Sequence, residues 1–332
     1  MTEAPRVHLL FGMARSGTSF IARALETAPG VAVFGESDFF GRGHRRPGAD
    51  GRYDRQALDA VAAIQASKDW ALTTGERDRP LARLAPGVYP KLVSEALGQL
   101  ERATPAETFA AIASAVAQHT RCATVIEKTP GHLLFVDRVA EALPDVRCVA
   151  SWREPAGFVR SFLDLDRRDP RALVRVLGRV SRHTALGVIM WRSYMRALVR
   201  ARTVLGPRLL IVSHTQLRDD PEQTLAGVAA HFGVEPPAGD LRKLPRNASA
   251  RPSAATPKDL GLWLRVLAAA ESRPIAYPKA TARAAVRSLA TITPAAVLFA
   301  ARTLPQAQRP LAYLRGYLGE GLGEGLGEGR SR

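Results

Sequence analysis

Hydrophobic residues in this chain gather in short continuous runs, and the segments between the runs mix hydrophobic and polar positions with a helical period. Short apolar runs bounded by turn residues are typical of buried strands. They predict strands at residues 6–12, 31–34, 123–126, 146–151 and 208–212. Each predicted strand is followed by a polar turn, which is where a ligand-binding loop of a parallel sheet is expected.

Helical patterns fill the intervals between these strands, at residues 18–28, much of 55–118, a segment ending near 143, 170–203 and 222–232. Strands that alternate with helices predict a central parallel sheet with helices on both faces. We therefore expect an α/β chain with three layers. Its ligand site should lie beyond the carboxyl ends of the strands.

The length of 332 residues and the hydrophobic content of 46% allow one sizeable core. We expect one main domain over residues 1–275, a helical extension over 276–318 and a flexible tail over 319–332, which ends in a glycine repeat. The most apolar late segment contains Arg287 and Pro294 and falls short of the roughly 20 apolar residues of a spanning helix. No transmembrane segment is expected, although peripheral contact with a membrane stays open.

The formal charge of +16 and the pI near 10.8 favour an anionic partner. Six of the 47 basic residues are lysines, the arginines are spread along the chain, and aromatic residues make up 6%, which together argue against a nucleic-acid partner. Cys122 and Cys148 lie in or beside apolar runs and are expected to be buried thiols. The first predicted strand starts too early for a secretory signal. We expect a cytoplasmic protein.

A phosphate-binding loop follows the first predicted strand. Gly12 and Gly17 bracket four residues, and Thr18 and Ser19 follow, which matches the spacing of a P-loop except for its lysine. Backbone amides at the start of the next helix would bind phosphate there. Without the lysine, triphosphate hydrolysis is disfavoured, whereas Arg15 supplies a charge suited to a leaving phosphate oxygen. The alternative is a tight turn that binds no ligand.

The RSGTS sequence at 15–19 resembles the donor loop of sulfotransferases that use 3'-phosphoadenosine-5'-phosphosulfate (PAPS). The resemblance extends over about residues 6–235 and includes SWREP at 151–155 and EKTPGH at 127–132, the latter similar to bacterial and Golgi-type members. It implies a P-loop-like fold and PAPS as co-substrate, with no metal. It also implies that the 5'-phosphosulfate is held by Arg15, Ser16, Gly17, Thr18 and Ser19, and the 3'-phosphate by Arg153 and Ser161.

One stretch departs from the family. Relatives often have Tyr-Glu-Asp-Leu after the last predicted strand, and this chain has His-Thr-Gln-Leu at 214–217. The acidic pair of that motif is therefore missing here.

Transfer of a sulfuryl group to a hydroxyl requires a base beside the nucleophile. Glu36 is the first candidate, because similar enzymes place a glutamate after the second strand. His132 is the second candidate, although it could instead cap the following helix, and Asp38 is the third. Lys128 would add positive charge against the sulfuryl oxygens, unless it pairs with Glu127.

These features predict a sulfotransferase that acts on a hydroxyl of a carbohydrate, lipid or natural product through a carboxylate base. A P-loop nucleotide kinase, which would need Mg²⁺, is one alternative. A non-catalytic protein that binds nucleotides or polyanions is another. The sequence identifies neither the acceptor nor the oligomeric state.

Overall fold

The computed structural model describes residues 4–41, 46–67, 84, 87–163, 184–241, 244, 258, 260, 261 and 264. The chain divides into two compact units, one of Met1–Glu154 with Tyr194–Ala250 and the other of Pro155–Ser193 with Arg251–Arg332. The expected domain end at residue 275, the helical extension and the glycine-rich tail lie outside the described residues. So does the first part of the helix expected at 170–203.

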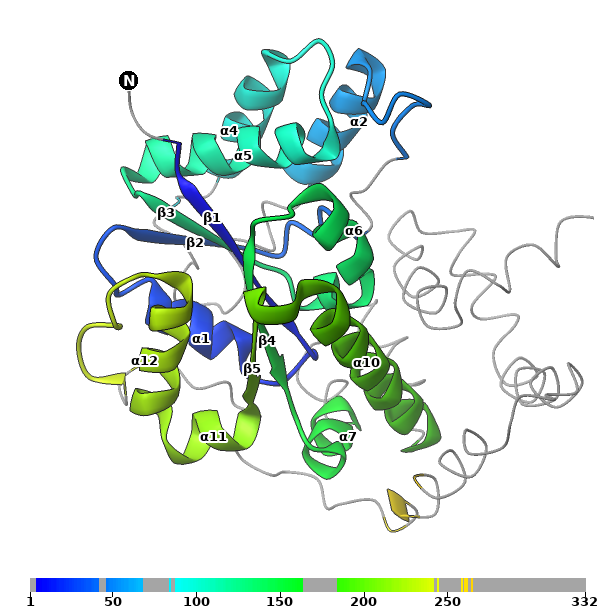
Figure 1. The fold of residues 1–332 in the computed structure, drawn as a ribbon, viewed down its shortest axis with the longest axis vertical. Helices are drawn as coiled ribbons and strands as arrows, with labels where there is room; N and C mark the ends of the chain where they lie inside the picture. Colours follow the sequence, from blue (N-terminus) through cyan, green and yellow to red (C-terminus); the bar gives the residue numbers. More distant parts are fainter. Residues whose placement is uncertain are drawn as a thin grey trace, which may run out of the picture. The chain divides into compact units, whose positions relative to one another are not determined.

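A parallel sheet forms the centre of the first unit (Figure 1). Its strands are β1 (Arg6–Gly12), β2 (Val31–Gly35), β3 (Thr124–Lys128), β4 (Arg147–Trp152) and β5 (Leu209–Ser213). They lie in the order β2-β3-β1-β4-β5, and every neighbouring pair is parallel. The predicted α/β fold with a central parallel sheet is confirmed. The chain crosses from one side of β1 to the other between β3 and β4, which places a ligand crevice at the carboxyl end of β1.

Strand β3 starts one residue later and ends two residues later than the sequence predicts, so Glu127 and Lys128 belong to the strand. Both side chains are buried. Successive side chains of a strand point to opposite faces of the sheet, so these two charges face away from each other. Lys128 pairs with Glu36 instead of Glu127. The hydrophobic pattern underestimates the length of such a strand, because charged residues rarely occupy buried positions without a partner.

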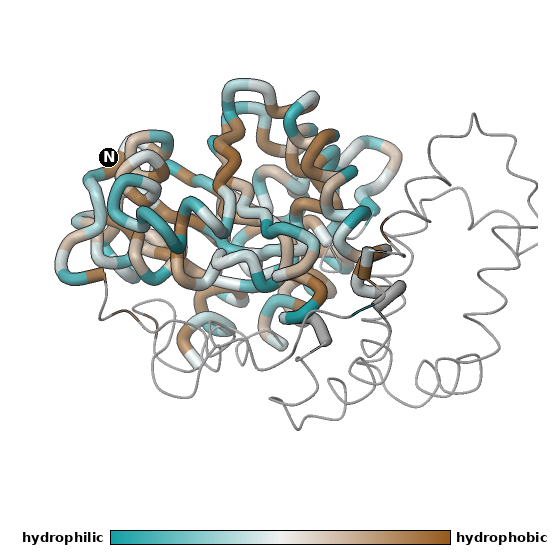
Figure 2. The backbone as a smooth tube through the Cα atoms, turned by 90° about the horizontal axis from the view of Figure 1, so that it is seen from below, coloured by the Kyte–Doolittle hydropathy of each residue, from teal (hydrophilic) through white to brown (hydrophobic). Residues whose placement is uncertain are grey.

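Helices cover both faces of the sheet. Helices α1 (Thr18–Leu25), α11 (His214–Asp219) and α12 (Pro221–Phe232) share a hydrophobic core with one face. On the other face α5 (Pro105–Thr120) contacts β2 and β3, and α4 (Val88–Gly98) and α2 (Arg55–Ala66) pack next to it (Figure 1). Hydrophobic and hydrophilic residues mix along the backbone, as elements with one buried side require (Figure 2).

The remaining described elements are the 3₁₀ helices η1 (Pro130–Phe135) and η2 (Gly206–Arg208) and the helices α6 (Val136–Ala142), α7 (Pro155–Leu163) and α10 (Thr184–Leu205). Helix α7 belongs to the second unit, and α10 runs from the second unit into the first. In the part of the chain that the structure describes, no helix combines the length and the apolar character needed to cross a membrane.

Local sequence signals set the ends of the helices. Thr104 and Glu107 form a reciprocal capping box at the start of α5, and Pro105 occupies the first helical position. Asp220 caps α12 by accepting a hydrogen bond from the backbone N–H of Gln223. These caps satisfy amide groups that a helix start otherwise leaves without partners.

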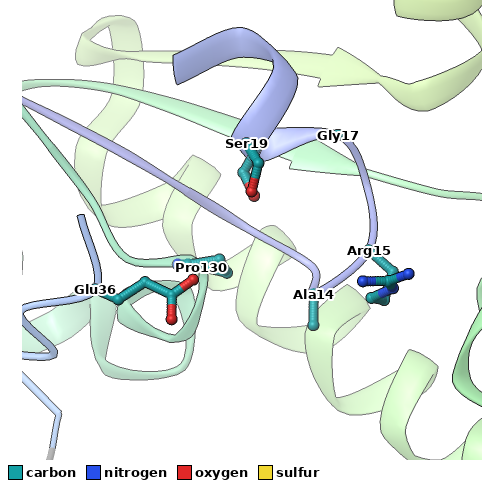
Figure 3. A pocket seen from close by; sticks show the side chains of 7 residues that line it. Ala14, Arg15, Gly17, Ser19, Glu36 and Pro130 are labelled. Carbon is teal, nitrogen blue, oxygen red and sulfur yellow. The ribbon is translucent and has the colours of Figure 1, made fainter. Parts of the chain in front are cut away.

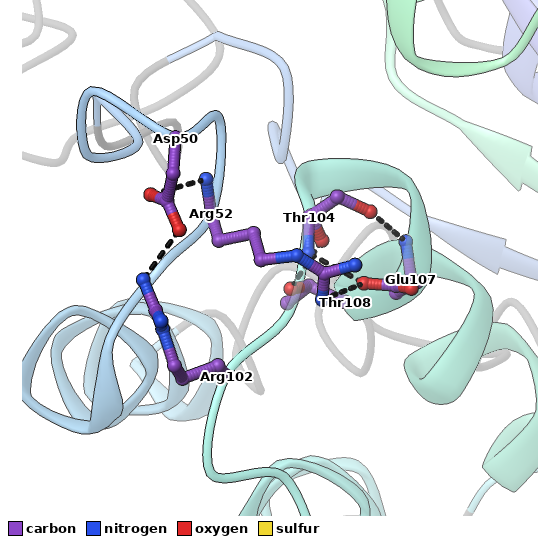
Figure 4. A network of polar contacts seen from close by, with 6 residues as sticks. All are labelled: Asp50, Arg52, Arg102, Thr104, Glu107 and Thr108. Atoms are coloured by element: carbon purple, nitrogen blue, oxygen red, sulfur yellow. Dashed lines mark hydrogen bonds and ion pairs between the residues drawn. The ribbon is translucent and has the colours of Figure 1, made fainter.

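A surface network anchors the segment before α2 to the start of α5 (Figure 4). Asp50 pairs with Arg102 and also accepts a hydrogen bond from the backbone N–H of Arg52. The Arg52 guanidinium in turn lies 3.1 Å from the carboxylate of Glu107. Hydrogen bonds from Thr104, followed by the nearby charge of Arg52, hold the pKa of Glu107 below its usual value. The network fixes how the chain enters the α2, α4 and α5 layer.

At the amino edge of the sheet, basic residues cover the end of α12. The guanidinium groups of Arg6 and Arg147 donate to the carbonyl oxygens of Gly233 and His231, at 3.0 and 2.9 Å. His8 is buried and stacks on Phe232 with ring centroids 4.9 Å apart. Burial, reinforced by the positive charges of Arg147 and Arg6, lowers the pKa of His8 to about 4. Cations near the last carbonyls of a helix also offset its dipole.

His8 should make the protein sensitive to mild acid. Because its pKa is lower in the folded chain than in the unfolded chain, the unfolded chain gains a proton first as the pH falls. We expect this to remove about 3 kcal/mol of unfolding free energy between pH 7 and pH 4, at about 1.36 kcal/mol per pKa unit. Urea unfolding at both pH values should show a smaller loss for His8→Phe than for the wild type. Equal losses of unfolding free energy in the two proteins would contradict the lowered pKa of His8.

Gly12 should tolerate no side chain. It pairs with Ser151 of β4 in the sheet and has φ of 146°. A Cβ atom at this position would lie 2.6 Å from the backbone nitrogen of Ser151. Gly12→Ala should therefore lower the unfolding free energy by about 3 kcal/mol or more, or prevent folding. Gly98→Ala, at a helical position with no atom within 4 Å, is the matched control and should be neutral or slightly stabilising in thermal unfolding.

Candidate functional site

The loop between β1 and α1 has the backbone geometry of an anion-binding turn. Gly12, Arg15 and Gly17 have φ values of 146°, 68° and 100°. The backbone N–H of Met13 donates to the carbonyl of Ser151 at 2.9 Å, which ties the loop to β4. Gly17 is the N-cap residue of α1 and provides no side chain to cap the helix. The first turn of α1 therefore presents its amides and its positive dipole end to a ligand.

Ser16 supports the loop from beneath. Its side chain is fully buried, and its hydroxyl donates to the carbonyl of Met13 at 2.6 Å. The Ser16 oxygen also shares a short hydrogen bond with the Ser151 hydroxyl. The structure thus brings Ser16 to β4 and turns its side chain away from the other residues expected to bind the donor.

A pocket of about 140 Å³ lies at the amino end of α1. Its walls are Ala14, Arg15, Gly17, Thr18, Ser19, Glu36 and Pro130. Figure 3 shows the Ser19 hydroxyl and the Glu36 carboxylate on different sides of this space, with Arg15 on the loop beyond. Four of the five residues expected to bind the phosphosulfate therefore line the same pocket as Glu36, the first candidate for the base.

Glu36 follows β2 and pairs with Lys128 from β3. The Glu36 carboxylate lies 2.9 Å from the Lys128 ammonium, and its backbone N–H donates to the Lys128 carbonyl at 2.7 Å. Lys128 is 1% exposed, whereas Glu36 is 49% exposed. Only the ionised carboxylate forms such an ion pair. The arrangement therefore presents a charged carboxylate at the pocket and keeps its cation beneath the surface.

Glu127 and His132 form a separate, fully buried pair. One carboxylate oxygen of Glu127 lies 3.0 Å from Nδ1 of His132, and the other accepts hydrogen bonds from the hydroxyls of Ser37 and Thr129. The backbone N–H of Phe40 donates to Nε2 of His132 at 3.2 Å. Burial opposes the negative charge, but His132 and the two hydroxyls outweigh it, so the pKa of Glu127 lies below its usual value.

The structure therefore distinguishes the three candidate bases. Glu36 lines the pocket. The ring of His132 is 0% exposed and both of its nitrogens face protein atoms, which removes it from the pocket surface. Asp38 does not line the pocket, and its backbone N–H donates to the Thr129 hydroxyl at 3.1 Å.

Arg153 lies at the end of β4 beside the phosphate loop. Its guanidinium donates to the carbonyl of Arg15 at 3.2 Å, and its backbone N–H contacts the sulfur of Met13 at 3.5 Å. The side chain is 11% exposed. Ser161, the other residue expected at the 3'-phosphate, lies in α7 of the second unit and has a buried side chain.

The segment that departs from the family motif lies against the phosphate loop. A Cβ atom on Gly17 would come within 2.7 Å of the Leu217 side chain and 3.8 Å of the His214 ring. Burial, followed by the charge of Arg153, lowers the pKa of His214 to about 4, so its ring is neutral at neutral pH. Gly17 is therefore required both for its backbone conformation and for the close approach of α11.

Sequence reasoning missed three residues that shape this site: Ser151, Glu127 and His214. A usable signal existed for Glu127, because a carboxylate directly after a buried strand needs partners. The partnership of Ser151 with Ser16 had no local signal, since it joins residues that are 135 positions apart.

The solved structures that resemble the chain include two sulfotransferases. The sulfotransferase domain of the olefin synthase from Synechococcus PCC 7002 is 20% identical, with a TM-score of 0.48 and coverage of 80% of this chain and 96% of that one. A sulfotransferase from Alicyclobacillus acidocaldarius is 16% identical, with a TM-score of 0.41 and coverage of 80% and 92%. A search of curated proteins gave no match.

The family comparison covers the elements that build the pocket. The model of the sulfotransferase family matches residues 9–238, which is more than half of the chain and extends from β1 through α12. The matched region includes the phosphate loop, Glu36, Lys128 and Arg153. This chain belongs to the sulfotransferase family.

Proposed function

We propose that this protein transfers the sulfuryl group of PAPS to a hydroxyl of a carbohydrate, lipid or natural product, with Glu36 as the general base. The observation that carries the proposal is the shared pocket, in which the uncapped amino end of α1 and the Glu36 carboxylate are walls of the same space. One wall suits an anionic donor and the other suits a hydroxyl that must lose a proton.

The residues of the loop fit the 5' end of the donor. The amides of Gly17, Thr18 and Ser19 belong to a helix start that has no side-chain cap. Arg15 adds a guanidinium to the pocket wall. This combination suits a phosphosulfate, because its negative charge increases on the bridging phosphate oxygen as the sulfuryl group leaves. Ser16 acts by holding the loop on β4.

The 3'-phosphate would bind Arg153. Its guanidinium is mostly buried, lies against the phosphate loop and has five N–H donors arranged for paired contacts with phosphate oxygens. Ser161 stays a predicted second contact. The two described cysteines, Cys122 and Cys148, are buried free thiols, which supports a reducing compartment such as the cytoplasm.

In the proposed reaction the acceptor oxygen attacks sulfur while Glu36 takes the hydroxyl proton. The bond between sulfur and the 5'-phosphate oxygen breaks, and 3'-phosphoadenosine-5'-phosphate leaves with the electron pair of that bond. Lys128 pairs with the Glu36 carboxylate and would place positive charge near the transferring group. In-line transfer requires that the base and the donor are held in place. In the proposed reaction the ion pair holds the base and the phosphate loop holds the donor.

Donor identity can be tested by isothermal titration with 3'-phosphoadenosine-5'-phosphate, AMP, and ATP with Mg²⁺. We expect metal-independent binding of the bisphosphate, and we expect Arg153→Ala to weaken it about 10- to 100-fold, the effect of losing a charged hydrogen-bond pair. Binding of AMP, which lacks the 3'-phosphate, should weaken much less in the same variant. Arg102→Ala, which removes a surface arginine paired with Asp50, is the charge-matched control. Preference for ATP with Mg²⁺ would instead favour a nucleotide kinase.

The base can be tested with Glu36→Gln and the matched variant Asp38→Asn. Both remove a carboxylate from the same loop, and both residues have positive φ, at 57° and 51°. Release of the bisphosphate from PAPS in the presence of a hydroxyl acceptor should fall about 10²- to 10⁴-fold for Glu36→Gln, the usual contribution of a general base. Asp38→Asn should stay near the wild-type rate. Bisphosphate binding by both variants should match the wild type, and a reversed order of rates would exclude Glu36 as the base.

A further inference from the structure

We propose that Glu127 and His132 are positioning residues that hold the Glu36 loop, residues 36–40, in the conformation needed for catalysis. The proposal rests on the proposed function, because the role of Glu36 as base comes from there. Neither residue lines the pocket, and both are fully buried. They therefore act through the loop and have no contact with the reacting groups.

The Glu36 loop needs support because its backbone is strained. Glu36 and Asp38 both have left-handed φ values, 57° and 51°, although neither is glycine. Each such residue costs about 1 kcal/mol or more and persists only where the surroundings enforce it. Relaxation of either residue would change where the Glu36 carboxylate points.

The backbone of the loop is bound at nearly every residue. The N–H of Asp38 donates to the Thr129 hydroxyl at 3.1 Å, and the N–H of Phe39 donates to the Ser37 hydroxyl at 3.3 Å. Both hydroxyls donate in turn to the same oxygen of Glu127. The N–H of Phe40 donates to His132. Three successive amides of the loop thus bond to Thr129, Ser37 and His132, and all three of these side chains contact Glu127.

The hydrogen bond from Phe40 fixes which nitrogen of His132 faces Glu127 as a donor. Because Nε2 of His132 accepts from Phe40, the ring proton is on Nδ1 and faces Glu127. A carboxylate can accept from His132 and from both hydroxyls at once, since all of its lone pairs are acceptors. A glutamine has one oxygen and one NH₂ group, so it would place a donor against either the ring proton or the hydroxyl protons.

The network continues into the helical layer that covers this face of the sheet. The amide group of Gln65, in α2, donates to the Ser37 carbonyl at 3.1 Å, and the Tyr89 hydroxyl, in α4, donates to Gln65 at 2.9 Å. The loop is therefore fixed from β3 on one side and from the helices on the other. Buried hydrogen bonds from several sides restrict a segment of this kind to one conformation.

The test uses Glu127→Gln in the full-length protein, with His8→Phe as a matched control. His8 is also a buried, charge-sensitive residue, but it stacks on Phe232 of α12, on the face of the sheet opposite to Glu127. Amide hydrogen exchange of residues 36–40 should accelerate at least about tenfold in Glu127→Gln and less than about twofold in His8→Phe. Equal acceleration in the two variants, or none in Glu127→Gln, would overturn the proposal.

A spectroscopic measurement separates positioning from a general loss of stability. Nitrogen NMR of labelled histidine, assigned with His132→Phe, should show the proton of His132 on Nδ1 in the wild type and a shifted Nδ1 signal in Glu127→Gln, because the partner of that nitrogen has changed. An unchanged His132 signal in that variant would contradict the tautomer argument and with it the proposal. Bisphosphate binding should persist in Glu127→Gln. If the wild-type protein does not bind the bisphosphate, the proposed function is wrong. The positioning proposal is still tested, because the exchange and NMR results do not depend on the identity of the donor.

Discussion

The opposite orientation of neighbouring side chains in β3 is the constraint on which the site depends. Glu127 and Lys128 are adjacent in sequence, but the pleat directs one to each face of the sheet. Each buried charge must then find its own partner, because an unpaired charge in a core is expensive. Lys128 takes Glu36 and Glu127 takes His132. One strand thereby fixes Glu36, the proposed base, and the loop that follows it.

The donor side of the site depends on backbone geometry far more than on side chains. Gly12 approaches β4 too closely for any side chain, and Gly17 leaves room for α11. Gly12, Gly17 and Arg15 between them have positive φ, and the turn ends in a helix start that forms part of the pocket wall. Positive charge enters this side through Arg15, with Arg153 close behind it. The acceptor side, by contrast, presents a half-exposed carboxylate.

The strand and helix pattern could be predicted from the sequence because hydrophobic periodicity reports burial directly. Glycine spacing indicated the loop after β1, and the resemblance to sulfotransferases indicated Glu36 and Lys128. The pattern did not show the end of β3, where charged residues occupy a buried strand, or the partner of the Ser16 hydroxyl, which lies 135 residues away. The interpretation of His132 as a base could not be decided from sequence, because its exclusion from the pocket depends on Phe40 and Glu127, which only the fold brings together.

The hydrogen bond from Arg153 to the carbonyl of Arg15 makes the two ends of the donor site mechanically dependent on each other. A cation that also braces the loop contributes to binding in two ways, through its charge and through the shape that it imposes on the neighbouring backbone. Changes at the two arginines should consequently be non-additive, since the second change acts on a loop that has already lost its brace. For the proposed donor, selectivity for its two phosphates would thus be a joint property of β4 and the loop.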